Sequence, residues 1–194
     1  MGKLALSLLI LLLVYAVFKE TEITHPPGMI APNTPVQVKI QSAPSFDYEG
    51  YAIFPLAKFH AKARVLSREN YYFGRQAKLS PIDLALGWGP MSNDEFLENI
   101  SISQSNRWYR WRTKDFSIRR TDIERNSANM HLIPANQEVK DRLKKTKKGS
   151  LVEFSGYLVK VKTNDNWEWA SSLTRNDTGS QACELVWVEE FSIH

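Results

Sequence analysis

Apolar and polar positions alternate along several stretches of the chain, and this pattern predicts a domain built mainly of β-strands. Residues 36–40 and 59–66 both place an apolar side chain at every second position. Successive side chains of a strand point to opposite faces, so this spacing is typical of strands with one buried face. The apolar segments 151–162 and 183–190 predict two further strands.

The long strand expected over residues 151–162 contains Gly156, which predicts a bulge or bend where the strand curls. Three consecutive turn-forming residues follow at 164–166, and the alternation resumes at Trp167. Residues 150–173 therefore predict a β-hairpin.

Helix-capping sequence patterns occur in the remaining segments. A serine, a proline and a closing glycine bracket residues 82–86, which predicts a short helix there. The capping-box patterns at 92–95 and 121–124 predict two more short helices. Asn136 is a suitable N-cap for a longer amphipathic helix over residues 137–145.

Strands joined by short helices predict a β-rich α+β domain over residues 36–194. Its simplest form is a curled small barrel of the OB type, or a close relative, with short connecting helices.

A hydrophobic run from Leu4 to Phe18 lies between Lys3 and Lys19. A helix of this length is about 22 Å long, less than the roughly 30 Å hydrocarbon core, so a cleaved secretory signal is the alternative to an anchor. The run stays apolar to its last residue, where a cleavable signal is polar, and the flanking lysines can snorkel. We therefore predict that residues 1–20 form an uncleaved transmembrane helix and make this a single-pass membrane protein.

Residues 21–35 contain four prolines, Gly28 and Asn33, a composition that predicts an extended tether. Lys3 and the terminal amine slightly favour an amino terminus inside the cytoplasm. The main domain is then expected on the extracytoplasmic side.

Composition excludes several classes of protein and site. The chain is 43% hydrophobic and 24% charged, so it is neither disordered nor collagen-like. Its single cysteine, Cys183, excludes an intramolecular disulfide and a thiolate-rich zinc site. No metal-ligand spacing and no phosphate-binding glycine-rich loop occur, and we expect no metal and no cofactor.

Charge is unevenly distributed within a net charge of +4. From Arg107 to Lys148 there are thirteen Lys or Arg and five Asp or Glu, a balance of +8, whereas residues 163–194 have one Arg and six acids, a balance of −5. Such asymmetry indicates a basic face for phospholipid headgroups, nucleic acid or acidic glycans, unless the two segments pair with each other or face solvent. The expected binding residues are Arg107, Arg110, Arg112, Lys144, Lys145, Lys147 and Lys148.

Residues 107–112 interleave arginines with aromatic residues. On an OB-like surface this pattern can stack bases and hold phosphates. As a strand, it places Trp108 and Arg110 on one side and Tyr109 and Trp111 on the other, and core packing explains it equally well. An extracytoplasmic domain makes nucleic acid the less favoured partner.

Two catalytic arrangements are conceivable around His131. A cysteine hydrolase would pair it with Cys183 and an orienting residue such as Asn129 or Asp177. Asp177 also belongs to an Asp-Thr-Gly tripeptide like that of aspartic proteases, but those enzymes pair two such loops and no second copy exists here. We interpret Cys183 as a small buried hydrophobe and Asp177 as part of a polar turn.

Several segments resemble a group of uncharacterised bacterial membrane-anchored proteins. They lie mainly in the carboxyl-terminal half and comprise Ser127 to Asn136, Gly156 to Val159, Trp167 to Arg175 and Asp177 to Glu184. The resemblance implies a bacterial envelope setting and carries no catalytic residues with it.

Together these patterns predict a membrane-tethered envelope protein whose β-rich domain binds or scaffolds a partner without catalysis. A hydrolase centred on His131 with Cys183 or Asp177 is one alternative. A nucleic-acid-binding OB-like domain facing the cytoplasm is the other.

Overall fold

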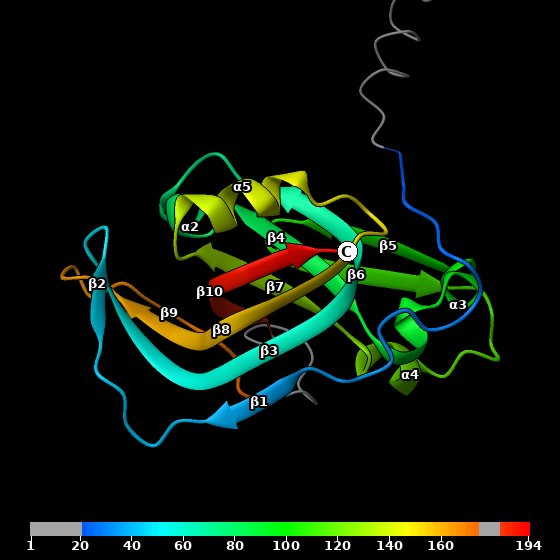
Figure 1. Ribbon diagram of the computed structural model, residues 1–194, viewed down its shortest axis with the longest axis horizontal. Coiled ribbons are helices and arrows are strands. Elements are labelled where there is room, and N and C mark those ends of the chain that lie inside the picture. Colours follow the sequence, from blue (N-terminus) through cyan, green and yellow to red (C-terminus); the bar gives the residue numbers. More distant parts are fainter. Residues whose placement is uncertain (1–20, 175–182) are drawn as a thin grey trace, which may run out of the picture.

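One twisted sheet contains most of the strands, and a separate two-stranded hairpin packs against it (Figure 1). The computed structural model describes residues 21–174 and 183–194. The predicted anchor over residues 1–20 and the loop 175–182 lie outside the described residues.

The main sheet consists of β1 (Val36–Lys39), β2 (Phe46–Tyr48), β3 (Tyr51–Asn70), β4 (Ile82–Gly87), β7 (Ser127–Pro134), β8 (Leu151–Lys162), β9 (Glu168–Ala170) and β10 (Glu184–Ile193). The hairpin consists of β5 (Ile100–Ser105) and β6 (Trp108–Thr113). The helices are α2 (Arg75–Leu79), α3 (Asp94–Leu97), α4 (Arg120–Glu124), α5 (Gln137–Lys145) and the 3₁₀ turn η1 (Gly89–Ser92).

Five strands of the main sheet close into a ring because β3 pairs with two different neighbours. Residues 52–64 of β3 pair with β8, and residues 64–70 pair with β4. The order around the ring is β3, β4, β7, β10, β8 and back to β3. Only the pairing of β7 with β10 is parallel; the other ring pairings are antiparallel. Figure 1 shows β3 and β8 curving together along the barrel.

The inside of the ring is filled with apolar side chains. Leu84, Leu132 and Val186 come from three adjacent strands and are fully buried in the same cluster. Val139 and Leu143 lie four residues apart on α5 and join this cluster, so the helix packs its apolar side on the barrel core.

The outer side of β4 is buried as well. All six of its residues are buried, and Ala85 packs against Ile100 of β5 and Ile123 of α4. Tyr109 and Trp111 of β6 pack on the same cluster. The hairpin therefore covers a face of the barrel that a solvated antiparallel sheet would fill with polar residues.

The helix predicted over residues 82–86 is wrong, because these residues form β4. They pair with β3 on one side and with β7 on the other, and both faces are buried. Tertiary contacts of this kind outweigh local capping signals. The helix in this region is α2, which ends directly before the serine–proline pair.

Other predicted elements are confirmed. The long strand occupies residues 151–162, and β9 follows a turn in which Asn166 has a φ of 64°. The Asn136 side chain accepts a hydrogen bond from the Val139 amide at 3.0 Å, as an N-cap does. Near residue 93 the helix is present, but its N-cap is Asn93, one residue after the predicted serine.

These elements confirm the β-rich α+β class. Within residues 21–174 and 183–194, no helix has both the length and the hydrophobicity needed to cross a bilayer.

The segment predicted as a tether lies against the barrel. The Ile23 amide donates to the Lys148 carbonyl at 2.9 Å, and a ring nitrogen of His25 lies 2.7 Å from the Gly149 carbonyl. Ala31 is 1% exposed, and its carbonyl accepts from the Gly89 amide. The packed unit therefore begins upstream of residue 36.

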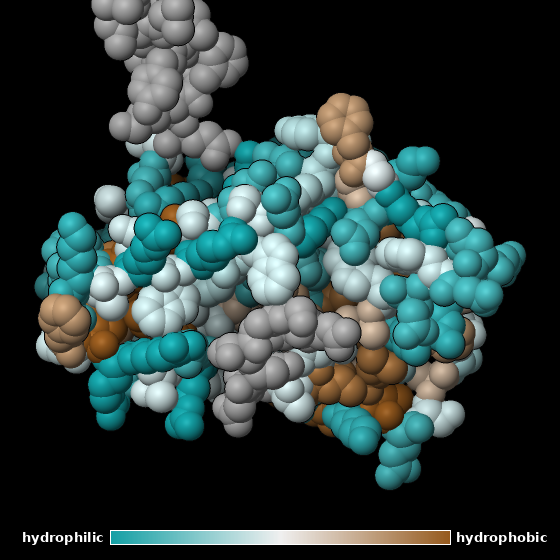
Figure 2. All heavy atoms as spheres, turned by 180° about the vertical axis from the view of Figure 1, so that it is seen from behind, coloured by the Kyte–Doolittle hydropathy of each residue, from teal (hydrophilic) through white to brown (hydrophobic). Residues whose placement is uncertain are grey.

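The surface seen in Figure 2 is largely polar, with apolar residues gathered low on the right. Phe73 and Phe116 are the most exposed apolar side chains of the described residues, at 93% and 103%. They lie far apart in the sequence and belong to different connecting segments.

Gly156 is expected to be essential for closing the ring. It pairs with Phe59 on one side and with Val188 on the other, next to a bulge in β10. A Cβ atom at this position would lie 1.9 Å from the Trp187 carbonyl oxygen. Gly156→Ala should lower the free energy of unfolding by at least about 2 kcal/mol, because the strands must move apart. Urea unfolding of the full chain in detergent micelles, followed by tryptophan fluorescence, measures this.

The neighbouring Ser155→Ala is the matched control. It removes a hydrogen bond to Glu190 on the exposed side and should change the free energy of unfolding by less than about 1 kcal/mol. Equal free energies of unfolding for Gly156→Ala and the control would show that a Cβ atom at position 156 is accommodated beside the Trp187 carbonyl, and would contradict the prediction.

Candidate functional site

A cluster of charged side chains is buried on the outer side of β4 and β7, beneath the tip of the hairpin. Asp83 of β4 is 0% exposed and His131 of β7 is 4% exposed. The two residues are direct partners in the antiparallel register. Arg107, at the hairpin turn, reaches them with a side chain that is 14% exposed.

Asp83 is the centre of this cluster. Its Oδ1 accepts a hydrogen bond from Nη1 of Arg107 at 2.5 Å, and its Oδ2 lies 2.9 Å from Nδ1 of His131. Nη2 of Arg107 donates to the Ser80 carbonyl at 2.9 Å. A buried carboxylate is tolerated only when it is paired and hydrogen-bonded, and Arg107 is the cation paired with Asp83 in this position.

Two aromatic rings enclose the cluster, Tyr71 from the segment after β3 and Trp169 from β9. The Arg107 guanidinium lies 3.7 Å from the centre of the Tyr71 ring and 5.6 Å from that of Trp169. The His131 ring lies 4.9 Å from Trp169. Burial is the main cause that raises the pKa of Tyr71 above its ordinary value, so the phenol stays neutral and acts as a hydrogen-bonding group. These rings exclude water from the ion pair and strengthen it.

The backbone of Arg107 is bound as tightly as its side chain. Asn106 and Arg107 have φ angles of 52° and 68° and form a two-residue turn between paired Ser105 and Trp108. Both signs match a type I′ hairpin turn, a conformation that costs energy for a residue other than glycine, asparagine or aspartate. The Arg107 amide donates to the Tyr71 hydroxyl at 2.8 Å.

Asn129 connects this turn to the cysteine. Its Nδ2 donates to the Arg107 carbonyl at 3.2 Å and lies 3.9 Å from Sγ of Cys183. Its Oδ1 accepts from Nε2 of Gln104 at 2.6 Å. The structure therefore gathers His131, Asn129, Cys183 and Arg107 in one place, and Asp177 lies outside the described residues.

Chemically, the contact between Asp83 and His131 resembles the orienting half of a catalytic dyad. Such a dyad orients its imidazole through a hydrogen bond, and the geometry of the contact between Asp83 and His131 does not make one. The same carboxylate is already paired with Arg107, and both Asp83 and His131 are buried. This arrangement suits a structural clamp better than a general base that must meet a substrate.

The other predicted basic residues lie on two separate surfaces. Arg110 and Arg112 are exposed on the outer side of β6 with Trp108, while Tyr109 and Trp111 face inward, as the alternation predicts. Burial raises the pKa of Tyr109 to about 12, since its hydroxyl lies beneath the hairpin. The four lysines Lys144, Lys145, Lys147 and Lys148 are exposed at the end of α5 and in the following loop. Arg107 belongs to neither surface.

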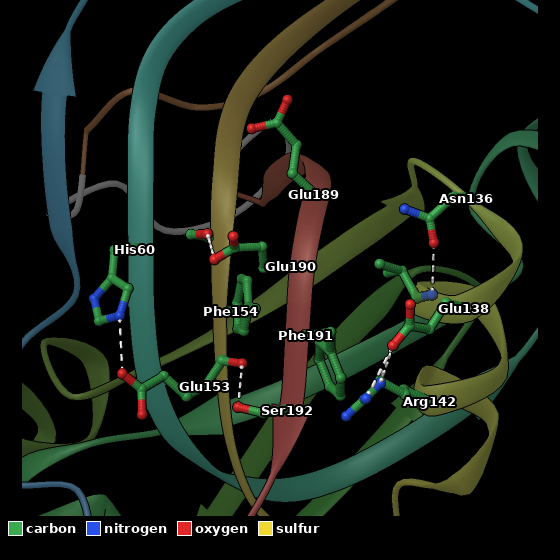
Figure 3. Close-up of a pocket in the computed structure, with 12 residues that line it drawn as sticks. His60, Asn136, Glu138, Arg142, Glu153, Phe154, Glu189, Glu190, Phe191 and Ser192 are labelled. Atoms are coloured by element: carbon green, nitrogen blue, oxygen red, sulfur yellow. Dashed lines mark hydrogen bonds and ion pairs between the residues drawn. The ribbon is translucent and has the colours of Figure 1, made fainter.

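One cavity of about 370 Å³ lies between α5 and strands β8 and β10 (Figure 3). Two of its four carboxylates are paired with basic side chains of the same chain. Glu138 pairs with Arg142 at 2.9 Å, and Glu153 accepts from His60 at 3.1 Å. The His60 hydrogen bond is the main cause that lowers the pKa of Glu153. The other two carboxylates, Glu189 and Glu190, form no ion pair within residues 21–174 and 183–194, so the cavity rim is acidic.

A second cavity of about 690 Å³ separates the amino-terminal segment from β5. Its lining includes Arg64, Lys148, Ser101 and Ile102. Within the described residues, no three His, Cys, Asp or Glu side chains are grouped as metal ligands.

Sequence reasoning missed three residues of the cluster: Asp83, Tyr71 and Trp169. Asp83 had a usable signal, because it is a lone carboxylate inside the apolar stretch 81–88, and a buried charge requires a partner. Tyr71 directly follows β3 and Trp169 lies on β9, far apart in the sequence, and the ring closure brings them together.

No protein-family model, no curated protein and no solved structure matches the chain. The resemblance to bacterial membrane-anchored proteins thus stays a prediction.

Asp83 and Arg107 should be strongly coupled in stability. Asp83→Asn leaves the guanidinium buried without its counter-charge, and Arg107→Met leaves the carboxylate in the same condition. Each change should cost about 2–4 kcal/mol, and the double variant should cost less than their sum by at least about 1 kcal/mol. Urea unfolding of the four proteins of this double-mutant cycle measures the coupling. Additive costs would contradict a direct ion pair.

Proposed function

We propose that this chain is a membrane-tethered, non-enzymatic binding protein of the bacterial envelope. Residues 4–18 anchor it, the barrel lies outside the cytoplasm, and the β5–β6 hairpin presents a basic aromatic surface to an anionic partner. The observation that carries this proposal is the separation of the arginines. The Arg107 side chain is 14% exposed and paired with Asp83, whereas Arg110 and Arg112 are exposed.

The ring order supports an OB-type barrel. Such a barrel has a long first strand that pairs with the second and fourth strands, and a helix between the third and fourth. Here β3, β4, β7, β8 and β10 take the five positions, and α5 lies between β7 and β8. OB barrels bind ligands over their second and third strands and the neighbouring loops. In this chain the outer side of β4 and β7 is covered by the hairpin, so we place the binding surface on the hairpin itself.

The outer side of the hairpin has the chemistry for an anionic ligand. Trp108 is 42% exposed, and Arg110 and Arg112 lie beside it at every second position of β6. Neither arginine forms an ion pair with any residue in the described ranges 21–174 and 183–194. Serines 101, 103 and 105 are their exposed cross-strand neighbours on β5. The surface therefore offers two arginine forks, one aromatic ring and a row of hydroxyls.

Acidic glycans are the class of partner that we favour. Their carboxylate or sulfate groups match the arginine forks, and an indole ring stacks on a sugar face as readily as on a base. Because an anchored domain outside the cytoplasm meets glycans rather than nucleic acid, single-stranded nucleic acid becomes the alternative outcome of the test.

The test compares two double variants of the full chain in uncharged detergent micelles. Arg110→Gln/Arg112→Gln should weaken binding to a uronate-rich polysaccharide at least roughly tenfold, because each arginine contributes a charge-assisted contact. Lys39→Gln/Lys58→Gln removes the same charge from exposed positions on β1 and β3 and should leave the affinity within roughly twofold. Tryptophan fluorescence titration at two salt concentrations measures both.

Equal weakening in the two variants would show that only net charge matters and would contradict a binding surface on the hairpin. Tighter binding of a single-stranded oligonucleotide than of the polysaccharide would favour the nucleic-acid alternative instead.

A further inference from the structure

The amino-terminal segment is fixed to the loop that follows α5. The Ile23 amide donates to the Lys148 carbonyl at 2.9 Å, and Nζ of Lys148 lies 2.8 Å from Oε2 of Glu22. Gly149 makes this approach possible: its φ is 90°, and a Cβ there would lie 1.9 Å from the Ile23 carbonyl oxygen. Residues 22 and 23 therefore have one defined place on the domain.

A buried arginine holds the same segment from the barrel side. Arg64 of β3 is 2% exposed and forms an ion pair with Asp94. Its Nη2 lies 3.7 Å from Oε1 of Glu22 and donates to the Ile23 carbonyl at 3.4 Å. The His25 amide completes the attachment by donating to Oδ2 of Asp94 at 2.6 Å. The point from which the chain leaves the domain is thus set by buried charge.

Four exposed lysines lie at the end of α5 and in the loop to which this segment is attached. Lys148 pairs with Glu22, and Lys144 lies 3.5 Å from Asp141. Lys145 and Lys147 are exposed and form no ion pair with any of the residues that the structure describes. After these two pairings, the end of α5 and its loop keep an excess of positive charge at the place where the chain departs.

The distance from this place to the hydrophobic run is short. The run ends at Phe18, and four residue steps to Glu22 span at most about 14 Å when fully extended. The headgroup region occupies roughly 5–8 Å of that distance on each side of a bilayer. Glu22 and its partner Lys148 are therefore held within about one Debye length, roughly 8 Å, of the headgroups, and the other three lysines precede Lys148 by at most four residues.

We propose that Lys144, Lys145, Lys147 and Lys148 form a second membrane contact that binds the anionic phospholipid headgroups of the bilayer holding the anchor. This inference rests on the membrane anchoring of the proposed function. The contact turns the end of α5 toward the membrane and fixes the orientation of the barrel. The outer surface of the β5–β6 hairpin then keeps a fixed orientation relative to the bilayer.

The experiment measures how fast each lysine of the full chain is acetylated by a water-soluble, charged reagent. The chain is reconstituted in nanodiscs of phosphatidylcholine alone or of phosphatidylcholine with phosphatidylglycerol, and mass spectrometry reports each site. Acetylation of Lys145 and Lys147 should be roughly fivefold slower in the anionic nanodiscs. Lys39 and Lys58, exposed on β1 and β3, should react equally fast in both.

Unchanged rates at Lys145 and Lys147, or equal slowing at Lys39 and Lys58, would overturn the proposal. Slowing by dissolved glycerol phosphate in neutral nanodiscs would also overturn it, because it would indicate a phosphate site rather than a membrane contact. Protection should disappear at high salt, where the Debye length falls to a few ångströms. Protection that persists there would contradict headgroup electrostatics.

A second variant separates the cluster from general charge effects. Lys145→Gln/Lys147→Gln should reduce the protection of Lys144 and Lys148, whereas Lys39→Gln/Lys58→Gln should leave it intact. Copurification with the nanodiscs tests the anchor independently. A chain that never enters the nanodisc refutes the anchoring itself, and a chain that enters without protected lysines refutes only this second contact.

Discussion

The buried carboxylate of Asp83 is the constraint on which the outer half of the structure depends. A charge on the outer side of β4 could be solvated only if that side of the barrel stayed open. It is covered instead, and a carboxylate removed from water needs a cation at hydrogen-bonding distance. Arg107 supplies this cation from a turn more than twenty residues downstream, which brings the whole β5–β6 hairpin onto the barrel.

The hairpin would be poorly fixed without this ion pair. Its two strands pair only with each other, and an isolated two-stranded hairpin is marginally stable in water. Apolar contacts beneath Tyr109 and Trp111 hold its middle. The clamp at Arg107 holds its tip, through the amide, the carbonyl and the guanidinium of one residue. A turn conformation that is strained for arginine persists because so many partners determine it.

Two arginines with carboxylate partners, Arg64 and Arg107, have a structural role that differs from that of the exposed basic residues. Arg64 fixes the point where the chain leaves toward its hydrophobic run, and Arg107 fixes the hairpin. Exposed cations remain beside each of them, on β6 and at the end of α5. In the account proposed above, one set faces a glycan and the other faces the bilayer, and the rigid barrel between them sets their separation.

Local sequence signals were sufficient for elements whose stability is local or periodic. Asn136 and the four-residue spacing of Val139 and Leu143 specify α5 almost completely. The local signals gave the wrong element over residues 82–86. A strand buried on both faces has no alternation of apolar and polar residues, so its sequence can be mistaken for that of a short helix. The helix prediction also gave no reason to expect a buried ion pair at Asp83, since a charged residue on a surface helix needs no partner. The meeting of Tyr71, Arg107 and Trp169 depends on ring closure, which no local pattern contains.

The most direct test is amide hydrogen exchange of the hairpin in Arg107→Gly. This change creates Asn-Gly at the turn, the pair most favoured by a type I′ hairpin, while removing the guanidinium from Asp83. If the clamp determines how the hairpin sits, the amides of β5 and β6 should exchange at least roughly tenfold faster than in the unmodified chain, with β8 unchanged. Hairpin amides that exchange at the same rate or more slowly would show that the local turn is enough, and would contradict the central role of the buried ion pair.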